Sequence, residues 1–283
     1  RLYPIPKLVC GFPESAAKNY FMNKDPFSHQ IIGLAMETHR SLGPGLAEEF
    51  YHQDLVARLT KASIEHLSKP RRELVYRGYV ADVFEPDLVF PGKLIPELKV
   101  LRGGFDAEHF TQLLSYCKFW RLRTGMLMDF GKASLVPKRI IYTSKTAELP
   151  QTDIPSFVSN ASLAKVLITI ANRCLADIGL GYRPTTWSGL ISAALRAESM
   201  DFTVNPSATV TGLGVTSLDC IVVQDQAVLA ISALGEEVTA MNRARLQTCL
   251  RWLDLPWGIC MHFGKSNADL TFVSHPKTSL RLS

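Results

Sequence analysis

Long apolar segments are missing from this sequence. Charged residues and prolines interrupt every stretch before it reaches the roughly 18 residues that a membrane helix needs. The first 21 residues lack the basic segment followed by an apolar segment that marks a secretory signal. The six cysteines are scattered and include no C-x-x-C pair, which argues against a zinc ribbon or a disulfide scaffold. We therefore expect a cytoplasmic protein with no membrane partner.

A strong net charge is also absent. The formal charge of +5 over 283 residues does not by itself require a nucleic-acid partner. Its distribution is uneven, because residues 150–283 carry ten Lys or Arg and ten Asp or Glu, so the whole excess precedes them. Hydrophobic residues make up 47% of the chain and charged residues 20%, which is typical of a globular protein rather than a disordered one. The near-neutral second half is therefore not expected to be the main phosphate-binding surface.

Apolar periodicity and helix-breaking residues give the first half a mixed α/β order. Apolar side chains at helical spacing predict helices over residues 28–40 and 46–62, separated by the segment SLGPG. β-Branched and aromatic residues predict strands between residues 73 and 100, and a third helix is predicted over residues 106–122. The segments GMLMDFG and RIIYT predict two short strands that close a domain near Thr143.

Three polar residues on two neighbouring predicted strands form the strongest candidate site. Asp87 begins one strand, and Glu97 and Lys99 lie on the next. Because side chains alternate along a strand, Glu97 and Lys99 point to one face, and a hairpin brings Asp87 beside them. Two carboxylates offer hard oxygen ligands for Mg²⁺ or Mn²⁺, and a lysine can orient a water, which suits phosphodiester hydrolysis. The alternative is an exposed hairpin with a solvated Glu/Lys pair.

Two predicted helices carry further polar candidates. Glu48 and Tyr51 are three residues apart, hence on one helix face, where Glu48 is either a third carboxylate or a favourable charge in the first turn. Gln112 and Tyr116 lie one turn apart on the third helix, and the alternative is a surface glutamine beside a half-buried tyrosine. His109, one turn earlier, either contacts a phosphate or caps and packs the helix.

Together these motifs resemble the GxxExxY protein family of the PD-(D/E)XK nuclease superfamily. The resemblance spans about residues 25–143 and rests on four blocks in order: GLAEEFY, PDLVFPGKLIPELK, HFTQLLSY and GMLMDFG. It implies an αβββαβ core in which helices flank a central mixed sheet. It also implies a Mg²⁺ or Mn²⁺ site formed by Glu48, Asp87 and Glu97.

The resemblance assigns roles to the remaining candidates. Lys99 would be the catalytic lysine, acting with Asp87 and Glu97. Gln112 and Tyr116 would be the pair that the RecB-like branch also carries in its Q-x-x-x-Y motif. Tyr51 and His109 would support the site or the substrate.

The second half of the chain resembles the first. The segments DIGLGYRPTTWSGLISAAL, LDCIVV and RLQTCLRWLDLPWGICMHFGK align in order with earlier segments, at offsets of 136, 132 and 133 residues. We therefore predict tandem nuclease-like domains. The expected division is an N-terminal extension (1–21), a domain with intact motifs (22–143), a linker rich in Ser, Thr and Pro (144–160), and a second domain (161–283).

The second domain is predicted to be catalytically dead. In this alignment Asp219 matches Asp87, but Pro184 stands in place of Glu48. Apolar Ile231 and Ala233 replace the second carboxylate and the lysine, and one carboxylate holds a divalent ion poorly. We expect the two domains to form an intramolecular pseudo-dimer, packed through equivalent surfaces about a twofold axis.

Two functions follow from these features. The first is a metal-dependent nuclease acting on DNA, whose phosphate backbone would be contacted by basic residues near the site: Arg102, Lys118, Arg121 and Arg123. The second is a non-catalytic module that binds nucleic acid or protein and retains the site as a remnant. The motif residues are intact in the first copy and lost in the second, which favours the enzyme.

Overall fold

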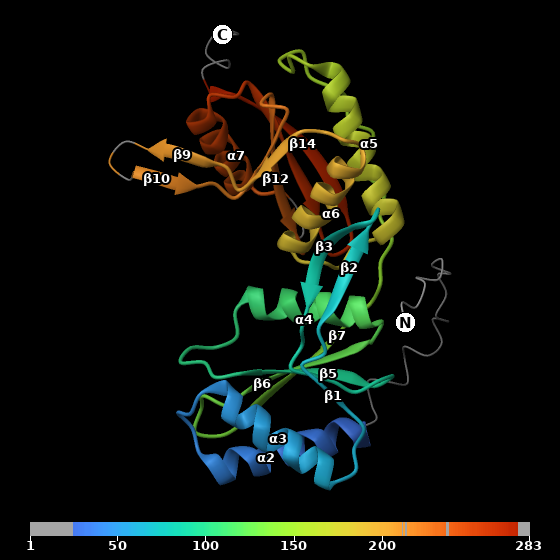
Figure 1. Cartoon of the computed structure of the whole chain (residues 1–283), viewed down its shortest axis with the longest axis vertical. Helices are drawn as coiled ribbons and strands as arrows, with labels where there is room; N and C mark the ends of the chain where they lie inside the picture. The colour runs from blue at the N-terminus through green and yellow to red at the C-terminus, as the bar shows by residue number, and fades with distance from the viewer. Residues whose placement is uncertain (1–24, 211, 213, 236–237, 277–283) are drawn as a thin grey trace.

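The computed structural model describes residues 25–276, except residues 211, 213, 236 and 237. The extension predicted for residues 1–21 lies outside the described residues. Two regions stand out in Figure 1, and we call them the N-terminal half (residues 25–143) and the C-terminal half (residues 161–276). Each half has helices on both faces of a sheet, so the predicted mixed α/β class is confirmed.

The N-terminal half begins with helices α2 (Pro26–Leu42) and α3 (Glu48–Lys61). Asp25 caps α2 by accepting hydrogen bonds from the backbone of Phe27 and Ser28. The remaining elements are β1 (Leu67–Ser68), β2 (Arg72–Tyr76), β3 (Tyr79–Phe84), β4 (Leu88–Val89), β5 (Leu94–Lys99), α4 (Ala107–Trp120), β6 (Thr124–Asp129) and β7 (Val136–Ile141). The predicted helices and strands lie at these places, with ends that differ by a few residues.

A three-stranded sheet forms the centre of the N-terminal half. Strand β5 runs parallel to β6, and β6 runs antiparallel to β7. Helix α4 covers one face of this sheet, and α2 and α3 cover the other (Figure 1). Gly125 lets α4 approach β6 closely, because a Cβ there would lie 2.7 Å from Leu113 and 2.9 Å from Cys117. Every residue of β6 is buried, so the strand beside the candidate site lies in the core.

The C-terminal half contains the same kinds of element in the same order. They are α5 (Ala161–Ile178), α6 (Pro184–Ala197), β8 (Phe202–Val204), β9 (Ser207–Val210), β10 (Gly214–Ser217), β11 (Ile221–Val223), β12 (Ala227–Ala233), α7 (Ala240–Leu253), β13 (Trp257–Phe263) and β14 (Ala268–Ser274). Its sheet has the order β14-β13-β12-β11-β8. As in the N-terminal half, a helix connects two parallel strands: α7 lies between β12 and β13 in the chain. The next strand, β14, pairs antiparallel with β13.

Helix ends also agree between the halves. The first helix of each half ends at a glycine with nearly the same backbone conformation, φ 72° at Gly43 and φ 71° at Gly179. The third helix of each half begins with a capping box and ends at a residue in the left-handed conformation, Arg121 or Asp254. The two halves therefore agree in how their helices begin and end, as well as in the order of their elements.

Strand pairing corrects the sequence alignment by one residue. In the N-terminal half, Glu97 of β5 pairs with Leu127, two residues after the glycine of β6. In the C-terminal half, Ala230 of β12 pairs with Cys260, two residues after the glycine of β13. The position equivalent to Glu97 is therefore Ala230 rather than Ile231.

The same correction applies to the other two site positions. Two residues further along the strands, Ser232 rather than Ala233 stands where Lys99 stands. Asp87 directly precedes β4, whereas the residue that directly precedes β11 is Cys220, not Asp219. Neither carboxylate nor the lysine is therefore kept at these three positions of the C-terminal half.

The two halves share one hydrophobic core cluster, and their closest contact is between β3 and α6. Gly189 of α6 lies against the backbone of Ala81, because a Cβ there would lie 2.7 Å from the carbonyl carbon of Ala81 and closer still to its oxygen. Asp82 accepts hydrogen bonds from Thr186 and Arg183 beside this contact. The hairpin β2–β3 thus belongs to the interface between the halves.

Lys118 of α4 makes a second link between the halves. Its ammonium group donates hydrogen bonds to the carbonyl groups of Ile178 (2.9 Å), Gly179 (2.8 Å) and Leu180. It thereby caps the carboxyl end of α5, where unpaired carbonyls and the helix dipole favour a cation. Within residues 144–160, Ile154, Phe157 and Val158 pack against the shared core, so the predicted linker is held in place.

The expected pseudo-twofold packing is wrong. A twofold relation would require the partners of each contact to be exchanged between the halves. Strand β3 packs on α6, whereas the elements in the matching places, β10 and α3, lie far apart in Figure 1. The halves therefore contact each other through different surfaces.

Candidate functional site

The site lies where β4 and β5 separate. Within the described residues, their backbone pairing is limited to a bridge between Phe90 and Leu94. Beyond this bridge side chains connect the strands: the amide of Leu98 donates to Asp87 Oδ2 (2.8 Å), and the amide of Asp87 donates to Glu97 Oε2 (3.3 Å). The opened hairpin therefore places the carboxylates of Asp87 and Glu97 next to each other, as the sequence predicts.

Glu97 and Lys99 form a buried hydrogen-bonded pair on the same face of β5. Lys99 Nζ lies 2.9 Å from Glu97 Oε1, and the Glu97 residue is only 3% exposed. Burial raises the pKa of Glu97 to about 8, and the negative charge of Asp87 raises it further. Burial lowers the pKa of Lys99, but Glu97 and the other nearby carboxylates outweigh it and raise the pKa above its ordinary value. Lys99 is therefore a stable cation at the centre of the site.

The raised pKa of Glu97 predicts a pH dependence of stability in the metal-free protein. The folded protein keeps the Glu97 proton up to about pH 8, whereas the unfolded chain releases it near pH 4.5. The folded state thus binds more protons between these values, so the free energy of unfolding should fall as pH rises, with a slope approaching about 1.4 kcal/mol per pH unit. Urea unfolding in a chelator measures this slope.

Glu97→Gln should flatten that slope, because the amide has no proton to lose. The matched control is Glu65→Gln, which changes an exposed glutamate away from the site and should keep the wild-type slope. An unchanged slope in Glu97→Gln would show that Glu97 titrates normally.

Glu48 begins α3 and reaches the same site. The side chain is half-buried, and burial raises its pKa. Lys99 lowers that pKa and Asp87 raises it, so the Glu48 carboxylate lies within electrostatic range of both groups. Its neighbour Glu49 points instead to Lys69, with which it forms an exposed ion pair.

The carboxylates have the donor chemistry of a hard divalent cation. Glu48, Asp87 and Glu97 supply oxygen ligands, which Mg²⁺ and Mn²⁺ prefer. Within the described residues, no group of three or more His, Cys, Asp or Glu side chains already converges on a position for a metal ion. Asp87 and Glu97 are instead engaged with backbone amides and with Lys99. The donor types fit a cation, and their present geometry is that of a hydrogen-bonded pair.

Helix α4 presents the predicted Gln/Tyr pair toward the segment before β4. Gln112 Nε2 donates to the Tyr116 hydroxyl (3.0 Å), which lies 3.4 Å from the Glu85 carbonyl oxygen. Burial raises the pKa of Tyr116, and the charges of Glu97 and Asp87 act in the same direction. The Tyr116 hydroxyl is therefore protonated at neutral pH and can donate a hydrogen bond.

Two predicted site residues lie in local structural roles. Tyr51 is fully buried, and its hydroxyl donates to the Gly43 carbonyl (2.6 Å) and accepts from the Leu46 amide (3.2 Å). It fixes the turn that positions the start of α3. His109 closes the capping box of α4, where its Nδ1 accepts from the Asp106 amide (3.1 Å). The capping alternative for His109 thus matches its observed contacts.

Two residues beside Asp87 have no signal in the sequence that singles them out. His52 Nε2 lies 3.2 Å from the Asp87 carbonyl oxygen, and the Lys69 amide donates to that oxygen at 2.9 Å. The charge of Lys69 also acts on Glu48, lowering its pKa. Lys69 has φ 45°, in the left-handed region, and only the folded loop brings it near the site.

The FGK segment after β6 supports the end of β5. Lys132 Nζ donates to the carbonyls of Leu101 (3.0 Å), Arg102 (2.8 Å) and Gly103. A Cβ on Gly131 would lie 2.6 Å from the backbone of Leu101, so only glycine permits this approach. Asp129 accepts from the Leu101 amide at 3.1 Å. These contacts hold the segment that directly follows Lys99.

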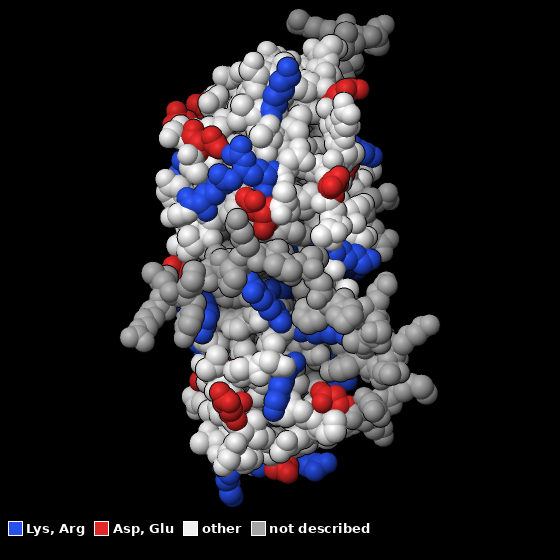
Figure 2. Space-filling model, turned by 90° about the vertical axis from the view of Figure 1, so that its right-hand side faces the viewer, with Lys and Arg blue, Asp and Glu red and all other residues white. Residues whose placement is uncertain are grey.

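The predicted phosphate contacts are only partly available. Lys118 is engaged with the end of α5, so its assignment as a phosphate-binding residue is wrong. Arg102, Arg121 and Arg123 are exposed. The face shown in Figure 2 has basic and acidic side chains interspersed, with no continuous basic stripe among its described residues.

Comparison with known families finds a match in the N-terminal half. Residues 25–140 match the model of the PD-(D/E)XK nuclease superfamily. This region is therefore similar to the PD-(D/E)XK nuclease superfamily. No curated protein and no solved structure matches the chain.

The superfamily match spans all of the proposed site residues. Asp87, Glu97 and Lys99 lie together in the opened hairpin, and the similarity to the superfamily suggests phosphodiester hydrolysis and a divalent metal. In the described part of the chain, no helix combines the length and the apolar content that crossing a bilayer requires.

Proposed function

We propose that this protein is a cytoplasmic, divalent-metal-dependent nuclease that hydrolyses DNA phosphodiester bonds, and that its N-terminal half belongs to the GxxExxY branch of the superfamily. The observation that carries the proposal is the buried Glu97–Lys99 pair beside Asp87, within a domain that matches the superfamily model. Buried charges are costly and are usually kept where chemistry needs them.

The residues of the site have complementary roles in this proposal. Mg²⁺ or Mn²⁺ held by Glu48, Asp87 and Glu97 would polarise the scissile phosphate and lower the pKa of a water. Lys99 holds a positive charge where negative charge develops on the phosphate oxygens. Tyr116 supplies a protonated hydroxyl, and Gln112 fixes its orientation. The segment held by Lys132 keeps the end of β5 in register with β6.

For the C-terminal half we propose a duplicated nuclease-like domain that has lost catalysis. The shared order of elements, the matching helix ends and the matching parallel crossover support the duplication. The loss of catalysis is supported by Cys220, Ala230 and Ser232 at the positions of Asp87, Glu97 and Lys99. The interface formed by α5 and α6 gives this half a structural role toward the N-terminal half.

A cleavage assay on labelled linear, circular and single-stranded DNA tests the proposed function. We expect cleavage with Mg²⁺ or Mn²⁺ and none with a chelator. Cleavage of circular DNA would identify an endonuclease. DNA or protein binding without cleavage under any of these conditions would favour the alternative, a binding module with a remnant site.

Glu48→Ala should weaken cleavage mainly through lower metal affinity. Glu48 contributes one carboxylate and is only half-buried, so its loss should leave the Glu97–Lys99 pair intact. We expect roughly a tenfold or larger loss at low Mn²⁺, which is partly restored when Mn²⁺ is raised. The measurement is the cleavage rate as a function of metal concentration. Glu49→Ala, which removes the neighbouring exposed carboxylate, is the control and should keep the wild-type metal dependence.

A further inference from the structure

The C-terminal half has a pocket on the α6 face of its sheet. The pocket has a volume of about 360 Å³ and lies between α6 and the strands β8, β11 and β12. Pro184 at its rim begins α6, as Glu48 begins α3. Cys220, which also lines it, directly precedes β11, as Asp87 directly precedes β4. The pocket therefore lies near the counterpart of the candidate nuclease site, on the α6 face of the sheet. Leu229 and Ile231 line it, so strand alternation points Ala230, the counterpart of Glu97, to the opposite face.

A smaller side chain stands on the helix wall of this pocket than at the same place in the N-terminal half. Ser188 lies on the first turns of α6, at the position that His52 occupies on α3. The small Ser188 side chain therefore leaves space at this wall, where the N-terminal half has the buried ring of His52. A volume of this size is within the usual range for small-molecule sites, about 300–1,000 Å³.

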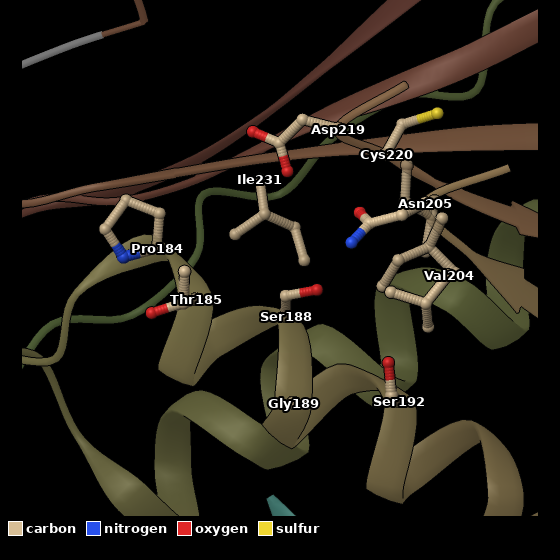
Figure 3. A pocket seen from close by; sticks show the side chains of 12 residues that line it. Pro184, Thr185, Ser188, Gly189, Ser192, Val204, Asn205, Asp219, Cys220 and Ile231 are labelled. Carbon is tan, nitrogen blue, oxygen red and sulfur yellow. The ribbon is translucent and has the colours of Figure 1, made fainter. Parts of the chain in front are cut away.

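The lining of the pocket excludes an anionic ligand. It contains no Lys, Arg or His, and its one charged residue is Asp219. Figure 3 shows Asp219 and Asn205 facing Ser188 and Ser192 of α6 across the pocket. The Ser192 hydroxyl is buried and has no hydrogen-bond partner among the described residues, and such a group is costly unless a ligand pairs with it. The pocket therefore suits a neutral ligand that brings N–H donors.

Apolar side chains supply the remaining wall. Ile231, Leu229 and Val204 line the pocket together with the polar groups. Ile231 projects between Asp219 and α6 in Figure 3. A flat ring can lie against such a wall while its edge reaches the carboxylate. This combination of an apolar face and a polar edge is that of a nucleobase.

We infer that this pocket binds a guanine base. Guanine presents adjacent N–H groups at N1 and N2, which can donate in parallel to the two oxygens of Asp219, as a bidentate pair. Its O6 can accept from the Asn205 amide, and its ring can contact Ile231. The absence of a cation among the lining residues means that the base or nucleoside is recognised rather than the phosphate. The base is either that of a free nucleoside or that of an unpaired guanine in a nucleic acid.

Calorimetric titration of the full chain with guanosine tests this inference without any cleavage step. We expect guanosine to bind, and inosine, which lacks the N2 amino group, to bind at least about tenfold more weakly, as expected for the loss of a hydrogen bond to a charged acceptor. Asp219→Asn should weaken guanosine binding by a similar factor or more. Asp225→Asn, an exposed change elsewhere in the same half, is the control and should bind guanosine like the wild type.

A second titration distinguishes the two sources of the base. It compares the binding of an oligothymidylate with that of the same strand containing one guanine. The full chain is titrated in buffer that contains a metal chelator, so that no cleavage occurs. A preference for the guanine strand that is lost in Asp219→Asn supports the inference, with a polynucleotide as the source if guanosine alone binds weakly. The inference is overturned if neither ligand binds, if inosine equals guanosine, or if Asp219→Asn, shown to fold by its unfolding curve, binds like the wild type.

Discussion

Replacing Lys99 with alanine is expected to reduce metal-dependent DNA cleavage by about a hundredfold or more. The Lys99 ammonium lies 2.9 Å from Glu97 Oε1, and the charges of Glu48 and Asp87 also act on it. A cation preorganised in a buried site stabilises the charge that develops on a phosphate, and the loss of one such group costs about 10²–10³ in rate. The measurement is the single-turnover cleavage rate at saturating metal.

The matched control for Lys99→Ala is Ser232→Ala. Ser232 occupies the same register position in the C-terminal half, where it hydrogen-bonds to His262 (2.9 Å). Its loss should leave the cleavage rate unchanged. Raised Mn²⁺ should fail to restore Lys99→Ala, unlike Glu48→Ala, because the lysine is proposed to stabilise charge rather than to hold the metal. Wild-type cleavage by folded Lys99→Ala would show that the lysine has no part in the reaction.

The sequence predicted the elements that carry the site because their signals are local. Helix α4, predicted over residues 106–122 and observed over Ala107–Trp120, has apolar residues at helical spacing and a capping aspartate, Asp106. The spacing of Asp87, Glu97 and Lys99 on two strands joined by a turn was enough to place them together. In both cases the contacts form between residues that are near each other in the chain.

Register in the C-terminal half could not be read from the same kind of pattern. The segment Cys220–Val223 is apolar at every position, so a shift of one residue leaves its hydrophobic pattern unchanged. The alignment accordingly matched Asp219 with Asp87, and only the strand pairs show that Cys220 has that place. The difference matters, because Asp219 does not occupy the position of the proposed metal ligand Asp87. It lines the pocket of the C-terminal half instead.

The contacts between the two halves could not be predicted from the sequence either. Lys118 and Arg121 both looked like surface cations at a helix end, but the fold buries Lys118 against the carbonyls of residues 178–180 and leaves Arg121 exposed. That outcome depends on where α5 ends in space. The predicted twofold packing failed for the same reason, because equal folds do not determine which surfaces meet.

Replacing Gly189 with alanine is expected to destabilise the protein by about 3 kcal/mol or more, at or above the upper end of the usual cost of overpacking. The added Cβ would lie 2.7 Å from the Ala81 carbonyl carbon and closer to its oxygen. The obstacle is backbone, which cannot rotate away as a side chain can. Strand β3 or α6 must therefore move, and the hydrogen bonds of Asp82 to Thr186 and Arg183 weaken with it. Denaturant or thermal unfolding measures the loss.

The control for this change is Gly33→Ala in α2. Gly33 also lies within a helix, but a Cβ there would have no heavy atom within 4 Å. Alanine is a better helix former than glycine, so this variant should gain about 0.5–1 kcal/mol. The two substitutions are chemically identical and should act in opposite directions, since only Gly189 lies against another backbone. If Gly189→Ala were as stable as Gly33→Ala, β3 would not pack on α6 in solution, and the two halves would be joined mainly by the contacts of Lys118 and α5.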